Sequence, residues 1–369
     1  MKKFVLISPK NRSAYNFRGD LIKEIQKKGY EVVVTGPNNE GIDKIEALGA
    51  KFIEVPVDKN GINPFADISY CLKLRHIFKQ EKADAILGYT IKPVIYGSIA
   101  GWLAGVKNRS AMVTGAGYLF ASKSAKAKLL RSISFMLYRL GLGAAHQVIF
   151  QNIDDLNEFV AHKLVKRSKC HVVNGSGVNM SKYIPAPYPE TPSFFFLGRL
   201  VHSKGGLDFA KAAKIVKSQH PESRFMILGK LEKDLPDAIR PEELMPYVDD
   251  GSVELFPETD DIPKYYAMTS VFVLPTAYRE GTPRVILEAM ASARAIITTN
   301  TPGCKETVVE GENGYFVASH NPDELAEKMQ IFVEHPEKIA VFGQRSYEIC
   351  KGKYEVSITN QRMLGIMGL

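Results

Sequence analysis

Two carboxylates, Glu280 and Glu288, lie eight residues apart around a turn that could bind a nucleotide sugar. Residues 271–275 before the turn are apolar and predict a buried strand, and the pattern of residues 283–293 predicts a helix. If the intervening segment is helical, a rise of about 1.5 Å per residue separates the glutamates by about 12 Å on roughly the same face. That span suits two ends of a nucleotide sugar, with one carboxylate accepting hydrogen bonds from sugar hydroxyls and the other from ribose hydroxyls.

The backbone between these glutamates is a second chemical feature. Gly281 and Thr282 precede Pro283, whose fixed φ suits the first position of a helix. Their amides would therefore lie at a helix N-terminus, where N–H groups and the helix dipole attract phosphate. The alternative is a solvated helix face with two ordinary glutamates, and the glycine and proline beside Glu280 argue against it.

The composition indicates a globular protein with two domains. The 369 residues are enough for two cores, and 45% hydrophobic with 24% charged residues is ordinary. The four cysteines are scattered, without metal or disulfide spacing, which suggests reduced cytosolic thiols. The apolar run near the N-terminus predicts a strand rather than a signal peptide, and residues 94–106, the longest apolar stretch, are too few to cross a bilayer.

Both halves of the chain alternate strands with helices, which is typical of parallel, doubly wound sheets. In the first half we expect strands at 4–7, 31–36, 51–55, 84–89 and 146–152, a strand that enters a glycine-rich loop within 109–117, and helices at 16–28, 42–48 and 122–142. The second half begins again with strands at 193–199, 225–230, 253–257, 271–275 and 295–299. Residues 184–192 between them are rich in proline and predict a linker.

The motifs around Glu280 resemble those of a known enzyme family. Residues 280–289, followed by 302–306 and 311–315, are similar to the retaining glycosyltransferases of family 4, and the resemblance covers essentially the whole chain. One departure is Ser-Ala-Arg-Ala at 292–295, where the family often has Cys-Gly-Lys/Arg-Pro; we expect a looser helix exit there and no effect on ligand contacts. Residues 278–284 and 114–118 look most like enzymes that extend polyprenyl-diphosphate-linked sugars for bacterial capsule, O-antigen or protein glycosylation.

This resemblance implies a GT-B fold, in which two Rossmann-like α/β domains face each other across a cleft. We expect an N-terminal acceptor-binding, membrane-facing domain at 1–183 and the linker at 184–192. The nucleotide-sugar-binding domain would occupy 193–346, and a C-terminal helix at 347–369 would cross back to the first domain.

The resemblance also implies catalytic and donor-binding roles. Glu280 would orient the donor sugar and Glu288 the ribose, while Arg199 and Lys204 would hold the diphosphate and offset the charge that builds on it. The full set of expected donor-binding residues is Gly198, Gly229, Phe256, Gly281, Thr282, Pro283 and Glu288. Because the acidic pairs at 154–155, 249–250 and 260–261 form no D-x-D motif at a strand end, we expect neither a metal nor another cofactor.

The acceptor side carries weaker signals. The loop at 9–15 lies where such sheets bind ligands, but it lacks the glycine pair that many family members have. A histidine that is frequent in the family near residues 90–117 is also missing. The candidate acceptor and cleft residues are Asn11, Arg12, Thr90, Lys92, Gly115 and Gly117. A basic loop exposed to solvent is nearly as good an explanation for Asn11 and Arg12.

The charge distribution points to an anionic partner. Residues 1–185 contain 28 Lys and Arg against 14 Asp and Glu, a net charge of +14, whereas the remainder carries −6. No nucleic-acid-binding signature is present, so anionic lipid is favoured. Residues 122–142 alternate basic and apolar positions and predict either a domain helix with a solvated basic face or a helix on a membrane surface. The basic residues expected at the membrane are Lys123, Lys126, Lys128 and Arg131.

Together these features predict a retaining, metal-independent glycosyltransferase. It would move a hexose or N-acetylhexosamine from a UDP-sugar to a polyprenyl-diphosphate-linked sugar, at the inner face of the cytoplasmic membrane. A nucleotide-sugar 2-epimerase of similar fold and a non-catalytic membrane-surface protein remain alternatives. A dinucleotide-dependent oxidoreductase should show G-x-G-x-x-G after a first strand, and neither half does. The sequence leaves open the donor sugar, the acceptor sugar, the linkage and the oligomeric state.

Overall fold

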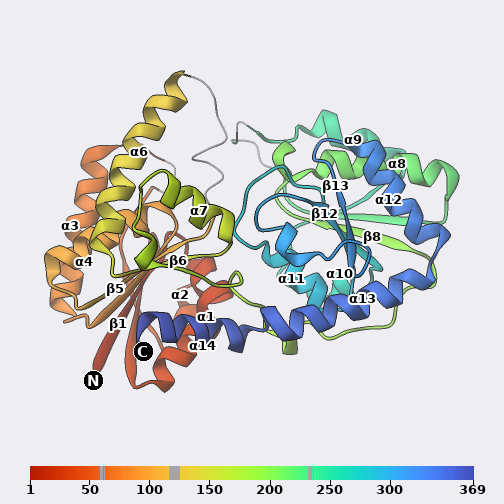
Figure 1. The fold of residues 1–369 in the computed structure, drawn as a ribbon. Coiled ribbons are helices and arrows are strands. Elements are labelled where there is room, and N and C mark those ends of the chain that lie inside the picture. The colour runs from red at the N-terminus through yellow and green to blue at the C-terminus, as the bar shows by residue number, and fades with distance from the viewer. Residues whose placement is uncertain (59–60, 62, 116–124, 232–234, 236) are drawn as a thin grey trace. The chain divides into compact units, whose positions relative to one another are not determined.

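The chain forms two compact α/β units in a computed structural model that describes residues 1–58, 61, 63–115, 125–231, 235 and 237–369 (Figure 1). Unit 1 comprises Met1–Ser176 together with Ser357–Leu369, and unit 2 comprises Gly177–Val356. Each unit has a parallel sheet of its own, as the strand–helix alternation predicts.

Unit 1 is built on a seven-stranded parallel sheet in the order β3-β2-β1-β4-β5-β6-β7. Its strands are β1 (Lys2–Ile7), β2 (Tyr30–Gly36), β3 (Lys51–Glu54), β4 (Ala85–Tyr89), β5 (Asn108–Val113), β6 (Gln147–Phe150) and β7 (Cys170–Val172). Its helices are α1 (Asn11–Lys27), α2 (Ile42–Glu46), α3 (Pro64–Gln80), α4 (Ser98–Ala104), α6 (Ala125–Ala144), α7 (Ile153–Ala161) and α14 (Val356–Met367).

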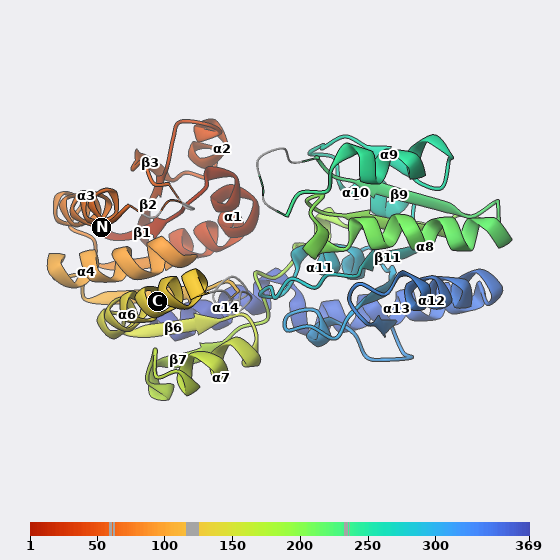
Figure 2. The same cartoon turned by 90° about the horizontal axis from the view of Figure 1, so that it is seen from above.

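Strand periodicity in β1 divides the core of unit 1 between the two faces of the sheet. Phe4 and Leu6 pack with α1 and α14, whereas the alternate residues Val5 and Ile7 pack with α3 and α4. On this second face α3, α4 and α6 lie side by side, as both views show (Figures 1 and 2). Helices on both faces bury the central strands β1 and β4, which therefore read as apolar runs, whereas the edge strand β3 stays partly exposed.

Unit 2 contains a six-stranded parallel sheet in the order β10-β9-β8-β11-β12-β13. Its strands are β8 (Ser193–Leu197), β9 (Arg224–Leu228), β10 (Glu254–Phe256), β11 (Val271–Leu274), β12 (Ala295–Thr299) and β13 (Gly314–Val317). Its helices are α8 (Gly206–Gln219), α9 (Pro241–Asp249), α10 (Pro263–Ala267), α11 (Arg284–Ala291), α12 (Pro322–Glu334) and α13 (Glu337–Ile349).

The structure moves the unit boundary from the proline-rich segment to Gly177. Val178 is buried in the core of unit 2, and its amide donates to the carbonyl of Tyr354 at 2.9 Å. The segment expected as a linker, 184–192, is also held by unit 2, because Tyr188 donates to the carbonyl of Ala293 at 2.8 Å and Arg294 to that of Ala186 at 2.9 Å. Proline density therefore marks a docked extended segment here.

Two helix boundaries also differ from expectation. Helix α1 begins at Asn11, so residues expected in the loop after β1 form its first turn. The expected single helix at 347–369 is interrupted: α13 ends at Ile349, a wide turn follows, and Glu355 has extended backbone before α14 begins. The residues after this break, from Ser357 on, group with unit 1.

Candidate active site

The candidate site of unit 2 lies where the order of its strands reverses. Strand β8 pairs with β9 on one side and with β11 on the other, and in such sheets ligands bind outside the carboxyl ends of the strands at this switch point. The loop after β8 carries Arg199 and Lys204, and the loop after β11 carries Glu280. The topology thus brings the three expected catalytic residues to one edge of the sheet.

The carbonyl of Ser203 ties these two loops together. It accepts hydrogen bonds from the amides of Ala277 and Tyr278, at 2.9 and 3.1 Å, and from the hydroxyl of Thr276 at 3.0 Å. Three donors from one loop on a single oxygen of the other fix the spacing of the two loops. Lys204, the next residue, is thereby held opposite the segment that leads to Glu280.

Lys204 and Glu280 form an ion pair across the switch point. The ammonium of Lys204 also lies 5.5 Å from the centre of the Tyr278 ring, in cation–π range. The side chain of Lys204 is 13% exposed and that of Glu280 is 21% exposed, so the charges are partly shielded from water. Arg199 is exposed and has no ion-pair partner among the described residues. A cation paired with a carboxylate, with a second cation in the same loop, can bind a diphosphate and a sugar hydroxyl together.

The turn after Glu280 differs from expectation. Helix α11 begins at Arg284, with Pro283 as its N-terminal cap in extended backbone, and Gly281 and Thr282 are buried just before it. Because residues 280–283 are not helical, the helical spacing of about 12 Å between the two glutamates does not apply. The amides of the turn still precede the first turn of α11.

Glu288 lies within α11 and its carboxylate is almost buried, at 8% exposure. Its Oε1 accepts from Nε of Arg284 at 3.1 Å, and its Oε2 accepts from the hydroxyl of Tyr266 at 3.3 Å. Tyr183 hydrogen-bonds to it as well. Burial raises the pKa of Glu288, and Arg284 opposes that effect. The hydroxyl of Tyr266 also donates to the carbonyl of Val285 at 2.8 Å, so its one proton is shared. Because a carboxylate has about four acceptor positions, Glu288 keeps room to accept from a ribose hydroxyl.

The other expected donor-binding residues occupy adjacent strand ends. The amide of Gly198 donates to the carbonyl of Leu228 at 3.2 Å, and that of Gly229 donates to the carbonyl of Phe256 at 3.4 Å. A Cβ added at Gly229 would lie 2.2 Å from the carbonyl oxygen of Gly198. Glycine is therefore required for the close approach of these strand ends, whatever ligand they contact.

In unit 1 the corresponding switch point lies between β1 and β4. Asn11 is buried in the first turn of α1, and its side-chain amide donates to the carbonyls of Asn38 and Glu40 at 2.7 and 2.8 Å. The amide of Asn11 therefore holds the chain after β2, which corrects its expected place in an open loop. Arg12 is exposed in the same turn.

The segment after β4 places two further acceptor candidates. Thr90 has a left-handed backbone with φ of 68°, and Lys92 is buried with its ammonium 2.6 Å from a carboxylate oxygen of Asp67. Gly115 follows β5 with φ of 137°, a conformation suited to glycine. Gly117 lies outside the described residues. The acceptor candidates that the structure describes all lie at the carboxyl edge of the sheet. The charge of Lys92 is already balanced by Asp67.

The expected membrane residues are only partly described. Arg131 is half-buried on α6; Lys123 and the side chains of Lys126 and Lys128 lie outside the described parts of the structure. Among the described helices, none is long and apolar enough to cross a membrane. The described residues also contain no group of three or more His, Cys, Asp or Glu side chains placed to hold a metal ion.

Several contacts of the site were missed by sequence reasoning. Tyr183 and Tyr266 reach Glu288 from positions far from it in sequence, and no local pattern signals such pairing. Tyr278 under the ammonium of Lys204 lies within the motif around Glu280, so its proximity to the site could have been inferred. Asp67, the partner of Lys92, lies on α3, a helix that the pattern of residues did not reveal.

Two units, each built on a parallel sheet with a switch point at its carboxyl edge, give the chain the GT-B architecture of many glycosyltransferases. Family models agree: residues 5–152 match the family described as glycosyl transferase 4-like, and residues 191–335 match glycosyl transferases group 1. The chain belongs to these glycosyltransferases of family 4.

Individual relatives span nearly the whole chain. An N,N'-diacetylbacillosaminyl-diphospho-undecaprenol alpha-1,3-N-acetylgalactosaminyltransferase of Campylobacter jejuni is 27% identical over 97% of this chain and 96% of its own length. The capsular polysaccharide biosynthesis glycosyltransferase CapM of Staphylococcus aureus is 24% identical over 91% and 89%. The crystal structure of Anabaena HepE in complex with UDP and glucose superimposes with a TM-score of 0.80 at 17% identity over 100% of both chains, which establishes the fold.

Proposed function

We propose that the protein is a retaining, metal-independent glycosyltransferase that moves a hexose or N-acetylhexosamine from a UDP-sugar to a polyprenyl-diphosphate-linked sugar. The observation that carries this proposal is the Lys204–Glu280 pair at the switch point of unit 2, beside the exposed Arg199. The names of the Campylobacter and Staphylococcus relatives support a lipid-linked acceptor in bacterial glycan synthesis, and the UDP complexes of HepE support the donor.

In the proposed reaction the acceptor hydroxyl attacks the anomeric carbon on the face from which the diphosphate leaves. The bond from that carbon to the phosphate oxygen breaks, its electron pair stays on the leaving UDP, and the hydroxyl proton passes to the departing phosphate oxygen. Arg199 and Lys204 stabilise the negative charge that develops on the diphosphate. When the diphosphate takes over the ammonium of Lys204, the carboxylate of Glu280 can accept hydrogen bonds from the donor sugar.

Glu288 supports the same assignment on the nucleoside side. Its remaining acceptor position suits one ribose hydroxyl, and its contacts with Tyr266 and Arg284 hold the carboxylate in one orientation. Unit 1 would then take the acceptor at the carboxyl edge of its sheet, near Lys92 and Gly115.

We also propose that unit 1 docks on an anionic membrane surface, which places the enzyme at the inner face of the cytoplasmic membrane. On α4 and α6, five large apolar side chains are 43% or more exposed: Trp102, Leu103, Ile133, Met136 and Leu140. Those on α6 follow helical spacing on one face, and the helix begins in a basic segment. Such apolar exposure next to basic residues is typical of interfacial helices.

The decisive experiment measures UDP release by the purified protein from a panel of UDP-sugars, with and without polyprenyl-diphosphate-linked acceptors, in EDTA. We expect release that requires an acceptor, persists in EDTA and is lost in Glu280→Ala and Lys204→Met. Glu334→Ala, at an exposed position of α12, is the matched control and should behave like the wild type. Epimerised donor in the absence of acceptor would establish the epimerase instead, and activity in Glu280→Ala would remove that residue from the mechanism.

A further inference from the structure

Thr276 is a fully buried residue in the loop after β11, and it contacts three loops of the candidate site. Its hydroxyl donates to the carbonyl of Ser203 at 3.0 Å and accepts from the amide of Tyr278 at 3.1 Å. Its carbonyl accepts from the hydroxyl of Thr299 at 2.6 Å. A single residue therefore connects the loops that follow β8, β11 and β12.

These contacts hold the backbone on both sides of Lys204. Ser203, which precedes Lys204, accepts from the hydroxyl of Thr276. Gly205, which follows Lys204, has φ of 80° and packs against Pro275, because a Cβ added at Gly205 would lie 2.4 Å from the Pro275 carbonyl oxygen. The backbone of Lys204 is thus held against the loop after β11 from two sides.

The hydroxyl of Thr276 also fixes the groups that face the ammonium of Lys204. The amide of Tyr278 donates to this hydroxyl, and the ring of Tyr278 lies 5.5 Å from the ammonium. Glu280, the ion-pair partner of Lys204, follows Tyr278 by two residues. A shift of Tyr278 would therefore move both the ring and the carboxylate relative to the ammonium.

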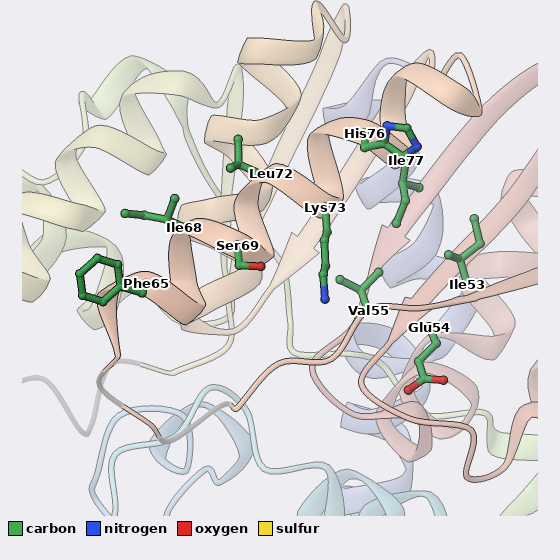
Figure 3. A pocket seen from close by; sticks show the side chains of 10 residues that line it. All are labelled: Ile53, Glu54, Val55, Phe65, Ile68, Ser69, Leu72, Lys73, His76 and Ile77. Carbon is green, nitrogen blue, oxygen red and sulfur yellow. The ribbon is translucent and has the colours of Figure 1, made fainter.

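The burial of Thr276 indicates that it acts on the site through its neighbours. Two hollows in the described parts of the chain are lined by other residues: an apolar one between α3 and β3 of unit 1 (Figure 3) and a polar one beside His202 and Glu243 in unit 2. Because Thr276 is fully buried, its hydroxyl contacts Ser203 and Tyr278 and not a substrate.

We infer that Thr276 is a positioning residue for sugar transfer, whose hydroxyl sets where the ammonium of Lys204 and the carboxylate of Glu280 meet the donor. The inference rests on the proposed function, since it gives Thr276 a part in that reaction. A shift of about 1 Å in a catalytic group can lower a rate about 100-fold, so a bond that fixes such groups contributes to catalysis without touching the substrate.

The test begins with the hydroxyl itself. Thr276→Val removes it and nearly keeps the volume of the side chain. We expect kcat to fall at least about tenfold with little change in KM for the UDP-sugar, because misplaced charges act mainly on the transition state. Thr276→Ser keeps the hydroxyl and should restore most of kcat.

Two further variants complete the series. Thr299→Val removes only the bond to the carbonyl of Thr276 and should lower kcat by less, about threefold. Thr269→Val is the matched control: Thr269 is fully buried just before β11, and its hydroxyl donates to the carbonyl of Tyr265. This control should lose stability and keep its kcat, so it separates a weakened fold from a displaced site.

NMR of the full-length protein with isotope-labelled lysine side chains reports the position of Lys204 without turnover. The ring of Tyr278 shifts the Lys204 signal, and Lys204→Met identifies that signal by its loss. In Thr276→Val the signal should move toward the position of exposed lysines, whereas in Thr269→Val it should stay in place.

Unchanged kcat in Thr276→Val or in Thr299→Val would overturn the inference. A Thr276→Ser variant as slow as Thr276→Val would also overturn it, as would a Lys204 signal that stays in place in Thr276→Val. A wild type that transfers no sugar, combined with a Lys204 signal that moves in Thr276→Val, would refute the proposed function while preserving the positioning role of Thr276.

Discussion

A Cβ atom added to Gly303 would lie 1.4 Å from the carbonyl oxygen of Gly281, so the backbone at 303 supports the turn that carries Glu280. Gly303 also has φ of 87°, which non-glycine residues rarely adopt. The two glycines lie in separate loops, and their direct backbone contact determines where Glu280 can lie.

Gly303→Ala should therefore reduce kcat about 100-fold, because moving a catalytic group by about 1 Å has an effect of that order. Gly311→Ala is the control: Gly311 has φ of 77° but no atom within 4 Å of an added Cβ. The control should lose about 1 kcal/mol of stability and keep its activity. Steady-state kinetics with urea unfolding separate the two effects, and equal kcat values in the two variants would contradict this role of Gly303.

Glu288 should give the unfolding free energy a recognisable pH dependence. Burial raises its pKa in the folded state above the ordinary value of 4.5. Above pH 4.5 the folded chain therefore holds more protons at this site than the unfolded chain. The contribution of Glu288 to the unfolding free energy consequently falls as pH rises, by at most about 1.4 kcal/mol per pH unit. Glu288→Gln should remove this slope in urea unfolding between pH 4.5 and neutrality, and parallel profiles for the two proteins would contradict it.

Ala293→Gly should stabilise the protein by about 0.5–1 kcal/mol. Ala293 follows α11 with φ of 57°, a left-handed conformation that costs a non-glycine residue about 1–2 kcal/mol and that glycine adopts readily. The same change at Ala291, the last residue of α11, where the backbone is still helical, should destabilise by about 1 kcal/mol. Thermal unfolding of both variants decides this, and a lower melting temperature for Ala293→Gly would contradict it.

Charge reversal at the start of α6 should weaken membrane binding. Each Lys near an anionic surface contributes about 1 kcal/mol to the binding free energy. Lys126→Glu with Lys128→Glu should therefore lower the affinity for anionic vesicles at least about 30-fold. Raised salt should lower the affinity of the wild type, because it screens the same charges. Lys182→Glu with Lys351→Glu, at exposed positions in unit 2, provides the control. Vesicle sedimentation in which both double variants behave alike would argue against docking through α6.

The sequence predicted the parts of the molecule that depend on local patterns. Strand–helix alternation indicated two parallel sheets, and the Glu280 motif placed Glu280 in the turn after β11. The start of α1 was missed because Asn11 and Arg12 are polar and begin a helix whose apolar residues come later. Helix α3 was missed because its exposed side carries Phe65 and Leu72, which weakens the amphipathic pattern that identifies a helix.

Contacts between distant segments could not be predicted in the same way. The pairing of Glu288 with Tyr266 and Tyr183 depends on how α10 and the chain after Val178 pack against α11. The docking of residues 186–188 depends on the fully buried Arg294, whose guanidinium stacks 4.8 Å from the centre of the Tyr188 ring. Proline content gave the opposite expectation of an independent linker, because composition does not reveal a partner that lies far away in the chain.

The place of α14 in unit 1 has a consequence for protein synthesis. Met363, Leu364 and Met367 are buried in the core beneath β1 and α1, and the side-chain amide of Asn108 donates to the carbonyl of Met367. On the ribosome, residues 1–176 emerge first, yet this core is completed only when residues 357–369 follow the whole of unit 2. Unit 2, which is continuous in sequence, can therefore reach its native state before unit 1 does. Such an order would be the reverse of the usual one, in which the N-terminal domain folds first.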